Sequence, residues 1–206
     1  GAGPGTSAPT TAGSAQPTDP PSSEPPATGE YRVTYGFAVP SGRISIDHTY
    51  QIPIAPAPAP PLPYLVGIYA GDHPEATPKY ARMSFYFRGT FPSYNFEYVP
   101  EVISEGKGDT IPLEGNAFIR LGFVNAQAHD NNGAPTVKAS PASHIGFGNL
   151  KSYGFAGDFE GHVTYGLGIQ VAPGSDQVLA LRTGELKKPD GAGGFYYVVH
   201  IDVQYG

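Results

Sequence analysis

The sequence contains no cysteine and no tryptophan, and methionine occurs once. The lack of cysteine excludes disulfides, thiolate catalysis and every cysteine-based zinc or iron–sulfur site. Charged residues make up 15% of the chain, the formal net charge is −6, and Lys187 and Lys188 are the one adjacent basic pair. Because nucleic-acid binding requires a basic surface that neutralises phosphates, we expect no nucleic-acid partner.

Long apolar runs and helical periodicity are also missing. No apolar run approaches the roughly 20 residues that cross a bilayer. No stretch of ten or more residues has apolar positions at helical spacing, and the 28 glycines and 23 prolines would interrupt one. The chain has no GxSxG elbow, no P-loop, no dinucleotide fingerprint and no HExxH pair among its six histidines. We therefore expect little helix, no cofactor, no metal and no enzymatic activity.

The first 29 residues carry no Val, Ile, Leu, Met, Phe or Tyr and are rich in Pro, Ser, Thr, Gly and Ala. Such a segment has too little apolar surface to offset the entropy of ordering its backbone, which predicts a disordered tail over residues 1–29. Residues 30–206 are expected to form a single all-β domain, with a proline-rich connector at 52–63 that runs extended. A spacer followed by a compact domain is typical of an ectodomain that is secreted or tethered by an anchor upstream of Gly1; a cytosolic protein with a tail, which has the same layout, is the less expected alternative.

Short alternating stretches begin at residue 31. Residues 31–39 and 44–46, separated by Pro, Ser and Gly, predict a hairpin-like pair. Residues 83–87 and 94–98, separated by a turn at 89–92, predict a second antiparallel pair.

The pattern continues to the end of the chain. Further strands are expected at 117–123, at 179–181 and at 195–205, whereas residues 182–194 read as a long polar loop. Many short strands without βαβ alternation predict an all-β fold, an antiparallel β-sandwich or an open barrel.

Residues 157–171, with the sequence GDFEGHVTYGLGIQV, place two carboxylates and a histidine directly before a strongly alternating stretch. Apolar side chains from Val163 to Val171 fall on one face of the expected strand. The opposite face carries His162, Thr164, Gly166, Gly168 and Gln170. We expect this second face, which has no apolar bulk, to be open to a ligand.

Two groups of polar residues are candidates for ligand binding. Asp158, Glu160 and His162 lie at a spacing of two, so on an extended strand they would project to one face about 6.5 to 7 Å apart. Such a row is the solvated face of a strand, a ligand or cation site, or, least expected, the carboxylate pair of a glycoside hydrolase. His129 and Asp130 lie in a polar loop closed by Asn-Asn-Gly, which suits either a ligand-binding pair or a turn with positive φ.

Aromatic residues make up 12% of the chain, and 14 of them are tyrosines. Exposed tyrosines stack on sugar rings or dock a protein partner at low entropic cost. Alternation assigns at least half of the rings to the core and leaves open which ones, and we take Tyr94 and Tyr98 as candidates for ligand contact. The full pool is Tyr86, Tyr94, Phe96, Tyr98, Tyr153, Tyr196 and Tyr197.

Five blocks of sequence carry a resemblance to a known family. They are ARMSFYFRG (81–89), PSYNFEYV (92–99), IPLEGNAFIRLGF (111–123), AQAHDNNGAPT (126–136) and GDFEGHVTYGLGI (157–169). In order and spacing they resemble the AMIN-like domain of secreted proteins and lipoproteins of actinobacteria. The resemblance covers about half of the chain and weakens after Val171, and Tyr31 to Pro63 has no counterpart that we can place.

The resemblance implies an extracytoplasmic, all-β, non-catalytic module of the kind associated with envelope targeting and peptidoglycan binding. We therefore expect binding of cell-wall polymer through one sheet face and its loops, with membrane contact only through an upstream anchor. An envelope scaffold that binds a protein partner through an exposed apolar or tyrosine-rich patch is the alternative. A wall-polymer hydrolase would need a cleft with a further carboxylate or a metal, and the oligomeric state stays open.

Overall fold

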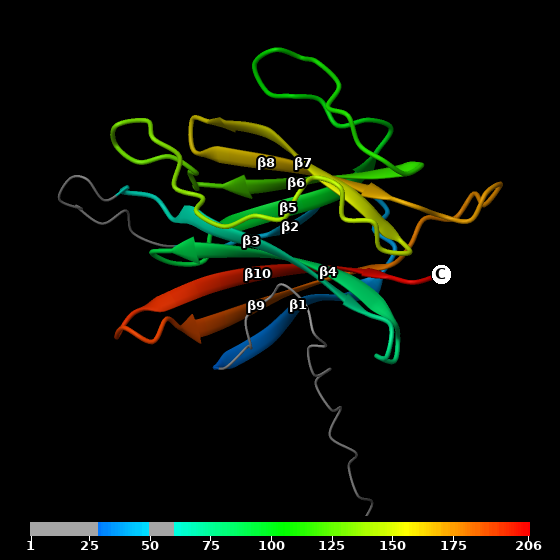
Figure 1. Cartoon of the computed structure of the whole chain (residues 1–206), viewed down its shortest axis with the longest axis horizontal. Coiled ribbons are helices and arrows are strands. Elements are labelled where there is room, and N and C mark those ends of the chain that lie inside the picture. Colours follow the sequence, from blue (N-terminus) through cyan, green and yellow to red (C-terminus); the bar gives the residue numbers. More distant parts are fainter. Residues whose placement is uncertain (1–28, 50–59) are drawn as a thin grey trace, which may run out of the picture.

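The computed structural model describes residues 29–49 and 60–206. Within these residues ten strands form two five-stranded antiparallel sheets that pack face to face, and the described chain has no helix (Figure 1). The predicted β-sandwich with little helix is confirmed. Residues 1–28 of the expected tail and residues 52–59 of the expected connector lie outside the described residues.

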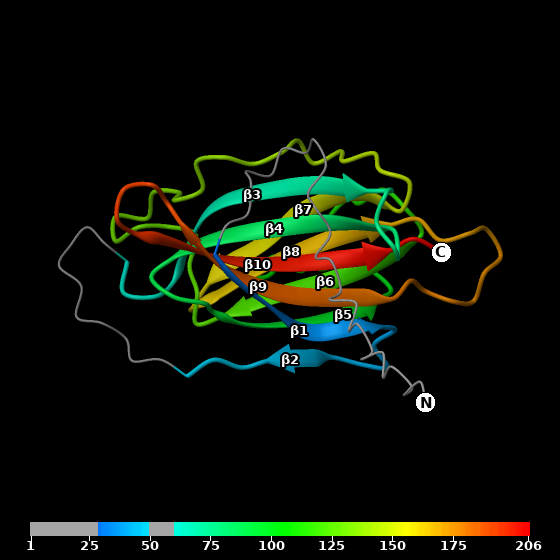
Figure 2. The same ribbon diagram turned by 90° about the horizontal axis from the view of Figure 1, so that it is seen from below.

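The strands divide between the sheets in an order that differs from their order in the chain. Sheet A has the order β1-β9-β10-β4-β3, and Figure 2 shows it face on; sheet B has the order β2-β5-β6-β8-β7. The strand bounds are β1 (Glu30–Ala38), β2 (Ile44–Ile46), β3 (Tyr64–His73), β4 (Tyr80–Arg88), β5 (Ser93–Val99), β6 (Ala117–Val124), β7 (Leu150–Phe159), β8 (His162–Ile169), β9 (Leu181–Pro189) and β10 (Phe195–Gln204).

Alternating side chains of both sheets fill the space between the layers. The core of sheet A comes from the apolar row Ala81, Met83, Phe85 and Phe87 of β4 and from its counterpart on β10. Ile119, Leu121 and Phe123 of β6 and the apolar face of β8 supply the core of sheet B. The sequence pattern therefore predicted correctly which side chains of these strands point inward.

Both predicted hairpins are wrong. β1 pairs with β9 in sheet A, whereas β2 pairs with β5 in sheet B. Likewise β4 pairs with β3 and β10, whereas β5 pairs with β2 and β6. Each short turn crosses from one layer to the other. Because both sheets have an apolar inner face, the alternation of a strand does not specify the sheet to which it belongs.

The expected polar loop at 182–194 is also wrong in its first half. Residues 181–189 form β9, which lies between β1 and β10 inside sheet A. The sequence of β9 lacks an alternating apolar pattern because Thr183 and Glu185 point inward. Hydrogen bonds to other side chains satisfy both of these buried polar groups. The loop proper is the short turn at 190–194 that joins β9 to β10.

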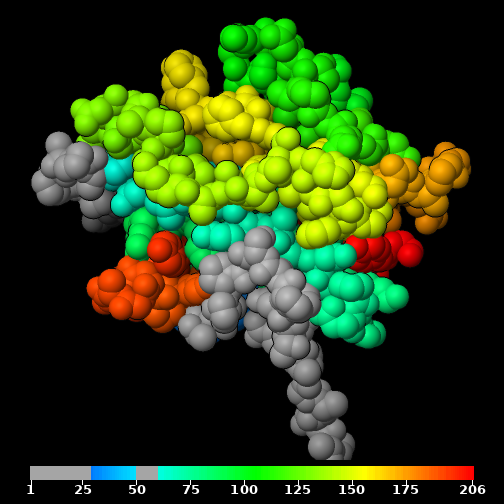
Figure 3. All heavy atoms as spheres, viewed as in Figure 1, coloured from blue at the N-terminus to red at the C-terminus, as the bar shows by residue number. Residues whose placement is uncertain are grey.

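The side of the sandwich between β3 and β7 is covered by residues 125–149, which join β6 to β7. Figure 3 shows part of this segment as a band across the molecule. Its backbone bonds to both sheets, through Leu65 N–H to Gln127 O (2.9 Å) and through Tyr153 N–H to Ser143 O (3.0 Å). The edge of β3 and the first part of β7, up to Tyr153, are thereby shielded from pairing with another chain.

The outer face of sheet B is covered by residues 100–116, the loop that lies above β7 and β8 in Figure 1. A Cβ atom on Gly168 would lie 1.9 Å from the carbonyl oxygen of Glu114, and one on Gly166 would lie 2.9 Å from Leu113. Thr164 is buried and donates to Glu105 of this loop (2.7 Å). The face expected to be open to a ligand is therefore closed over Thr164, Gly166 and Gly168, whose glycines leave room for the loop, whereas His162 at the start of β8 is exposed.

Candidate functional site

Of the polar residues singled out in the sequence, His129 and Asp158 come together. His129 Nδ1–H donates to Asp158 Oδ2 at 2.6 Å, and the backbone N–H of Ala128 donates to the same oxygen at 3.1 Å. Asp158 is largely buried, with 12% of its side chain exposed, whereas His129 is 40% exposed. The pair ties the loop after β6 to the end of β7.

The other members of the two groups point elsewhere. Asp130 accepts hydrogen bonds from the N–H groups of Asn132 and Ala134, which makes it the side chain that closes its own turn. Glu160 lies in the turn between β7 and β8 with φ at +49°, so the expected single face for Asp158, Glu160 and His162 is wrong. In the part of the chain described by the structure, no group of three acidic or histidine side chains could hold a metal ion.

The candidate tyrosines of β5 are structural. Tyr94 is 1% exposed, and its hydroxyl donates to Glu185 Oε2 at 3.0 Å. Burial first, and then the nearby charge of Glu185, raises the pKa of Tyr94 far above its usual value. Tyr98 donates to the carbonyl of Leu179 at 2.7 Å, and burial raises its pKa as well. Neither hydroxyl is placed to meet a ligand from solution.

Glu185 is the centre of a buried polar network on the side of the sandwich where the edge strands β1 and β2 lie. Its carboxylate is fully buried and accepts hydrogen bonds from Arg32 Nε (2.7 Å), His48 Nε2 (2.6 Å) and Tyr94. These partners come from sheet A, from the segment after β2 and from sheet B. The network therefore connects the two layers, next to the ring contact of Tyr35 with Phe96 at 5.3 Å.

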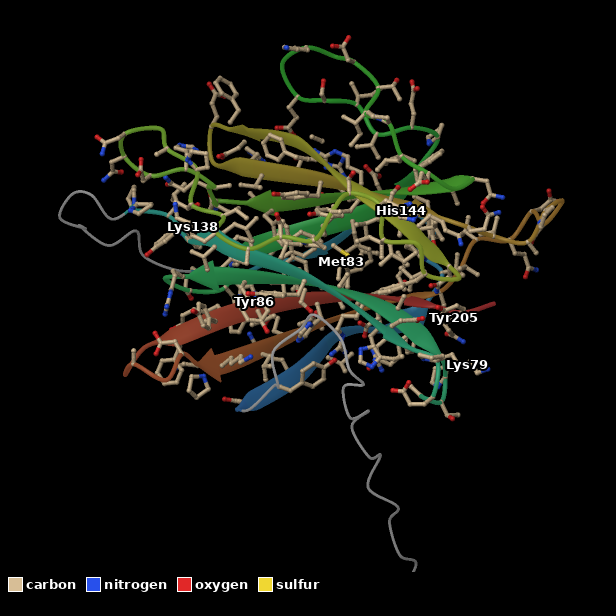
Figure 4. The ribbon with its side chains drawn as sticks, in the orientation of Figure 1. Lys79, Met83, Tyr86, Lys138, His144 and Tyr205 are labelled. Atoms are coloured by element: carbon tan, nitrogen blue, oxygen red, sulfur yellow. The ribbon has the colours of Figure 1, made fainter. Side chains whose placement is uncertain are left out.

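The outer face of sheet A carries a pocket with a volume of about 510 Å³. Figure 4 shows the arrangement: Met83 of β4 lies between the layers, whereas Tyr86 lies on the outer side of the same strand. Six of the lining residues matter for recognition, and together they define what we call the outer-face pocket. They are Tyr69, Tyr86, Arg88, Lys138, Lys188 and Tyr196.

Three tyrosines line the pocket as a continuous aromatic surface, which we call the tyrosine wall. Tyr69 of β3 packs on Tyr86 of β4 with 4.8 Å between ring centroids, and Tyr86 packs on Tyr196 of β10 at 5.5 Å. Tyr86 is buried, while the other two are half-buried. Gly67 opposes Tyr86 across the β3–β4 ladder, and a Cβ there would crowd the ring of Tyr69 at 3.1 Å.

Cationic side chains surround the tyrosine wall. The guanidinium of Arg88 lies 4.1 Å from the ring centroid of Tyr196, and Lys188 Nζ lies 5.4 Å from that of Tyr86. Lys138 enters from the segment that runs along β3, held there by its backbone N–H, which donates to Val66 O (2.9 Å). Asp190 is the one carboxylate of the lining, so the pocket has a formal excess of two positive charges on a chain of net charge −6.

Asp190 fixes Arg88 in place. Its Oδ2 accepts from Arg88 Nη1 at 2.6 Å, and its Oδ1 accepts from the N–H groups of Ala192 (2.7 Å) and Gly194 (3.0 Å). The hydrogen bond from Ala192, and next that from Arg88, lowers the pKa of Asp190 below its usual range. The turn between β9 and β10 is thus the support on which the arginine rests.

Sequence reasoning included Tyr86 and Tyr196 in the aromatic pool and noted the adjacent pair Lys187 and Lys188. It missed Tyr69, Arg88 and Lys138. No local pattern indicates these three, because β3, β4 and the loop before β7 bring them together from positions up to 69 residues apart in the sequence.

A comparison with family models matches residues 63–189 to the AMIN-like domain, which is more than half of the chain. The chain belongs to the AMIN-like domain family. No match was found among curated proteins or among solved structures. Family membership indicates an extracytoplasmic module associated with the cell envelope.

The AMIN-like match begins just before β3 and ends with β9, past Val171, where the resemblance was expected to weaken. It contains every residue of the outer-face pocket except Tyr196, which follows on β10. β1, β2 and β10 complete the two sheets from outside the matched residues. No helix long and apolar enough to span a membrane occurs within residues 29–49 and 60–206.

Proposed function

We propose that this AMIN-like domain is a non-catalytic module of the cell envelope that binds cell-wall polymer, either peptidoglycan or an associated glycan. The observation that carries the proposal is the family match over residues 63–189. The module acts by binding alone: it holds whatever polypeptide it belongs to against the wall.

The distribution of the outer surfaces supports this proposal. One broad face, that of sheet B, is packed under residues 100–116. The other broad face carries a pocket of about 510 Å³ lined by aromatic rings. This volume lies within the usual range for small-ligand sites, and tyrosine rings offer the flat apolar surface on which sugar rings stack.

The experiment is co-sedimentation of the full chain with purified sacculi. We expect the folded protein to pellet with sacculi, to stay in solution with an insoluble polymer of another kind such as cellulose, and to be released by soluble muropeptides. A folded sample that stays in the supernatant with sacculi would contradict the proposal.

A second candidate function, a scaffold that binds an envelope protein, is favoured by one observation. Phe155 and Phe159 of β7, the edge strand of sheet B, are 54% and 66% exposed. Exposed phenylalanines at a sheet edge suit a protein partner better than a glycan. A photo-cross-linker at position 159 would then capture one stoichiometric partner in the native envelope, and scattered or absent products would exclude this function.

A further inference from the structure

We propose that the outer-face pocket binds a sugar ring that carries a carboxylate, with the ring on the tyrosine wall and the carboxylate on Arg88. This inference rests on the proposed function, because it names the part of the wall polymer that the module recognises and the side chains that recognise it.

Arg88 has unused hydrogen-bonding capacity within the described residues. Its Nη1 donates to Asp190 Oδ2 (2.6 Å) and to the carbonyl of Phe195 (3.1 Å). Among the residues that the structure describes, Nε and Nη2 have no hydrogen-bond partner, and 30% of the side chain is exposed. These two nitrogens form one edge of the guanidinium, and that edge matches the two oxygens of a carboxylate.

The side chain of Arg88 is held in one conformation by its neighbours. Arg88 is stacked on Tyr196 and tied to Asp190, which is itself held by two backbone N–H groups of the turn at 190–194. An arginine already fixed in one conformation loses less entropy when it binds an anion than a mobile one does. The cost of ordering the arginine has thus been met by folding.

The charge and the aromatic lining of the pocket together favour one class of ligand. The pocket has an excess of cationic side chains on an acidic protein, so it attracts an anion that the rest of the surface repels. Lys138 is exposed at its rim and is positioned to add a second cation. A simple anion would not need the tyrosine wall, and a neutral sugar would not need Arg88, whereas a carboxylated sugar uses both.

The test compares three soluble probes by NMR titration of the full chain. N-acetylmuramic acid and N-acetylglucosamine share a ring and differ in the carboxylate-bearing ether, and glucuronic acid carries its carboxylate on another carbon. We expect N-acetylmuramic acid or glucuronic acid to bind at least about tenfold more tightly than N-acetylglucosamine, because the carboxylate adds charge-assisted hydrogen bonds. The ratio of the two acidic sugars distinguishes a uronic acid from a muramic acid whose carboxylate is free, because a muramic carboxylate that carries a stem peptide is an uncharged amide. Equal affinity for all three, or no binding, overturns the proposal.

Arg88→Gln should reduce the affinity for the acidic sugar about tenfold, to the level of N-acetylglucosamine. Arg43→Gln is the matched control, because Arg43 also forms one ion pair at the surface, with Glu97 at 2.8 Å, but lies outside the pocket. If Arg88→Gln does not fold, Lys138→Gln takes its place and should weaken binding several-fold, with the exposed Lys107→Gln as its control. Unchanged affinity in the pocket variants overturns the proposal.

Sacculi separate this inference from the function on which it rests. If the unmodified chain is not retained, the proposed function fails. If the chain is retained and Arg88→Gln is retained equally well, the function stands and the pocket is not the site.

Discussion

The closed outer face of sheet B can be tested by adding one methyl group at Gly168. The Cβ of Gly168→Ala would lie 1.9 Å from the carbonyl oxygen of Glu114 and 2.6 Å from Ser152 Oγ, whereas real Cβ atoms essentially never come closer than 3.0 Å. The backbone at Glu114 would therefore have to move by about 1 Å.

Two hydrogen bonds hold that backbone in place and would be weakened by the shift. Glu114 N–H donates to Ser152 Oγ (2.8 Å), and Asn116 N–H donates to the carbonyl of Ile169 (2.9 Å). Each contributes about 1 kcal/mol, and forcing a methyl group into a packed interface costs a further 1 to 3 kcal/mol or so. We expect Gly168→Ala to lower the free energy of unfolding by about 3 to 5 kcal/mol.

Gly36→Ala on β1 is the matched control, because a Cβ at Gly36 meets no atom within 4 Å. This variant should change the stability by less than about 0.5 kcal/mol or raise it slightly, since alanine restricts the unfolded chain. Urea unfolding followed by tyrosine fluorescence measures both variants. A Gly168→Ala protein as stable as Gly36→Ala would refute the placement of residues 100–116 on β8, and with it the closure of that face.

Two further predictions concern buried polar groups. Glu185→Ala should lower the free energy of unfolding by about 2 to 4 kcal/mol in the same urea assay, less than for a fully buried ion pair because Arg32 is 55% exposed and can return to water; an unchanged midpoint would mean that the network does not connect the sheets. Burial first, and then the positive charges of Arg82 and Arg182, holds the pKa of His200 well below its ordinary value of about 6.5. Below pH 6.5 the unfolded chain binds a proton at this residue that the folded chain does not. The free energy of unfolding therefore decreases as the pH is lowered, by up to about 1.4 kcal/mol per pH unit from this residue. The stability difference between the wild type and His200→Asn should therefore shrink between pH 7 and pH 5, and parallel pH curves would contradict this.

Residue pattern predicted the strands well where one side of a strand is apolar and the other is not. β4, β6, β8 and β10 all follow this rule, and their inward side chains were assigned from sequence. β9 was missed because its inward face carries Glu185, which its partners from distant strands keep satisfied. A polar segment can be a loop or a strand whose polar side chains are buried in a hydrogen-bond network. Which of the two it is depends on contacts with distant residues, which no local stretch of sequence contains.

The pairing of the strands and the residues of the outer-face pocket could not be predicted from the sequence, because both also depend on contacts between distant residues. A four-residue turn such as 89–92 suits a hairpin, yet here it links two layers, because strands of both sheets bury equivalent apolar rows. The glycines of β8 suggested an open ligand face, although their real role is to admit a loop that lies 50 or more residues earlier in the chain. In the pocket, Tyr86 and Tyr196 could be suspected from residue type, whereas Arg88 becomes a candidate only once Asp190 and Tyr196 are seen beside it.

We propose above that this domain contacts wall polymer through the outer face of sheet A. Lysine footprinting can detect this contact, because Lys138 at the rim of the outer-face pocket and Lys107 on the loop over sheet B are both exposed. The protein is acetylated with and without saturating sacculi, and modification at each lysine is measured by mass spectrometry. We expect sacculi to protect Lys138 and to leave Lys107 as reactive as before. Protection of Lys107 with Lys138 still reactive would place the polymer on the opposite face and contradict binding through sheet A.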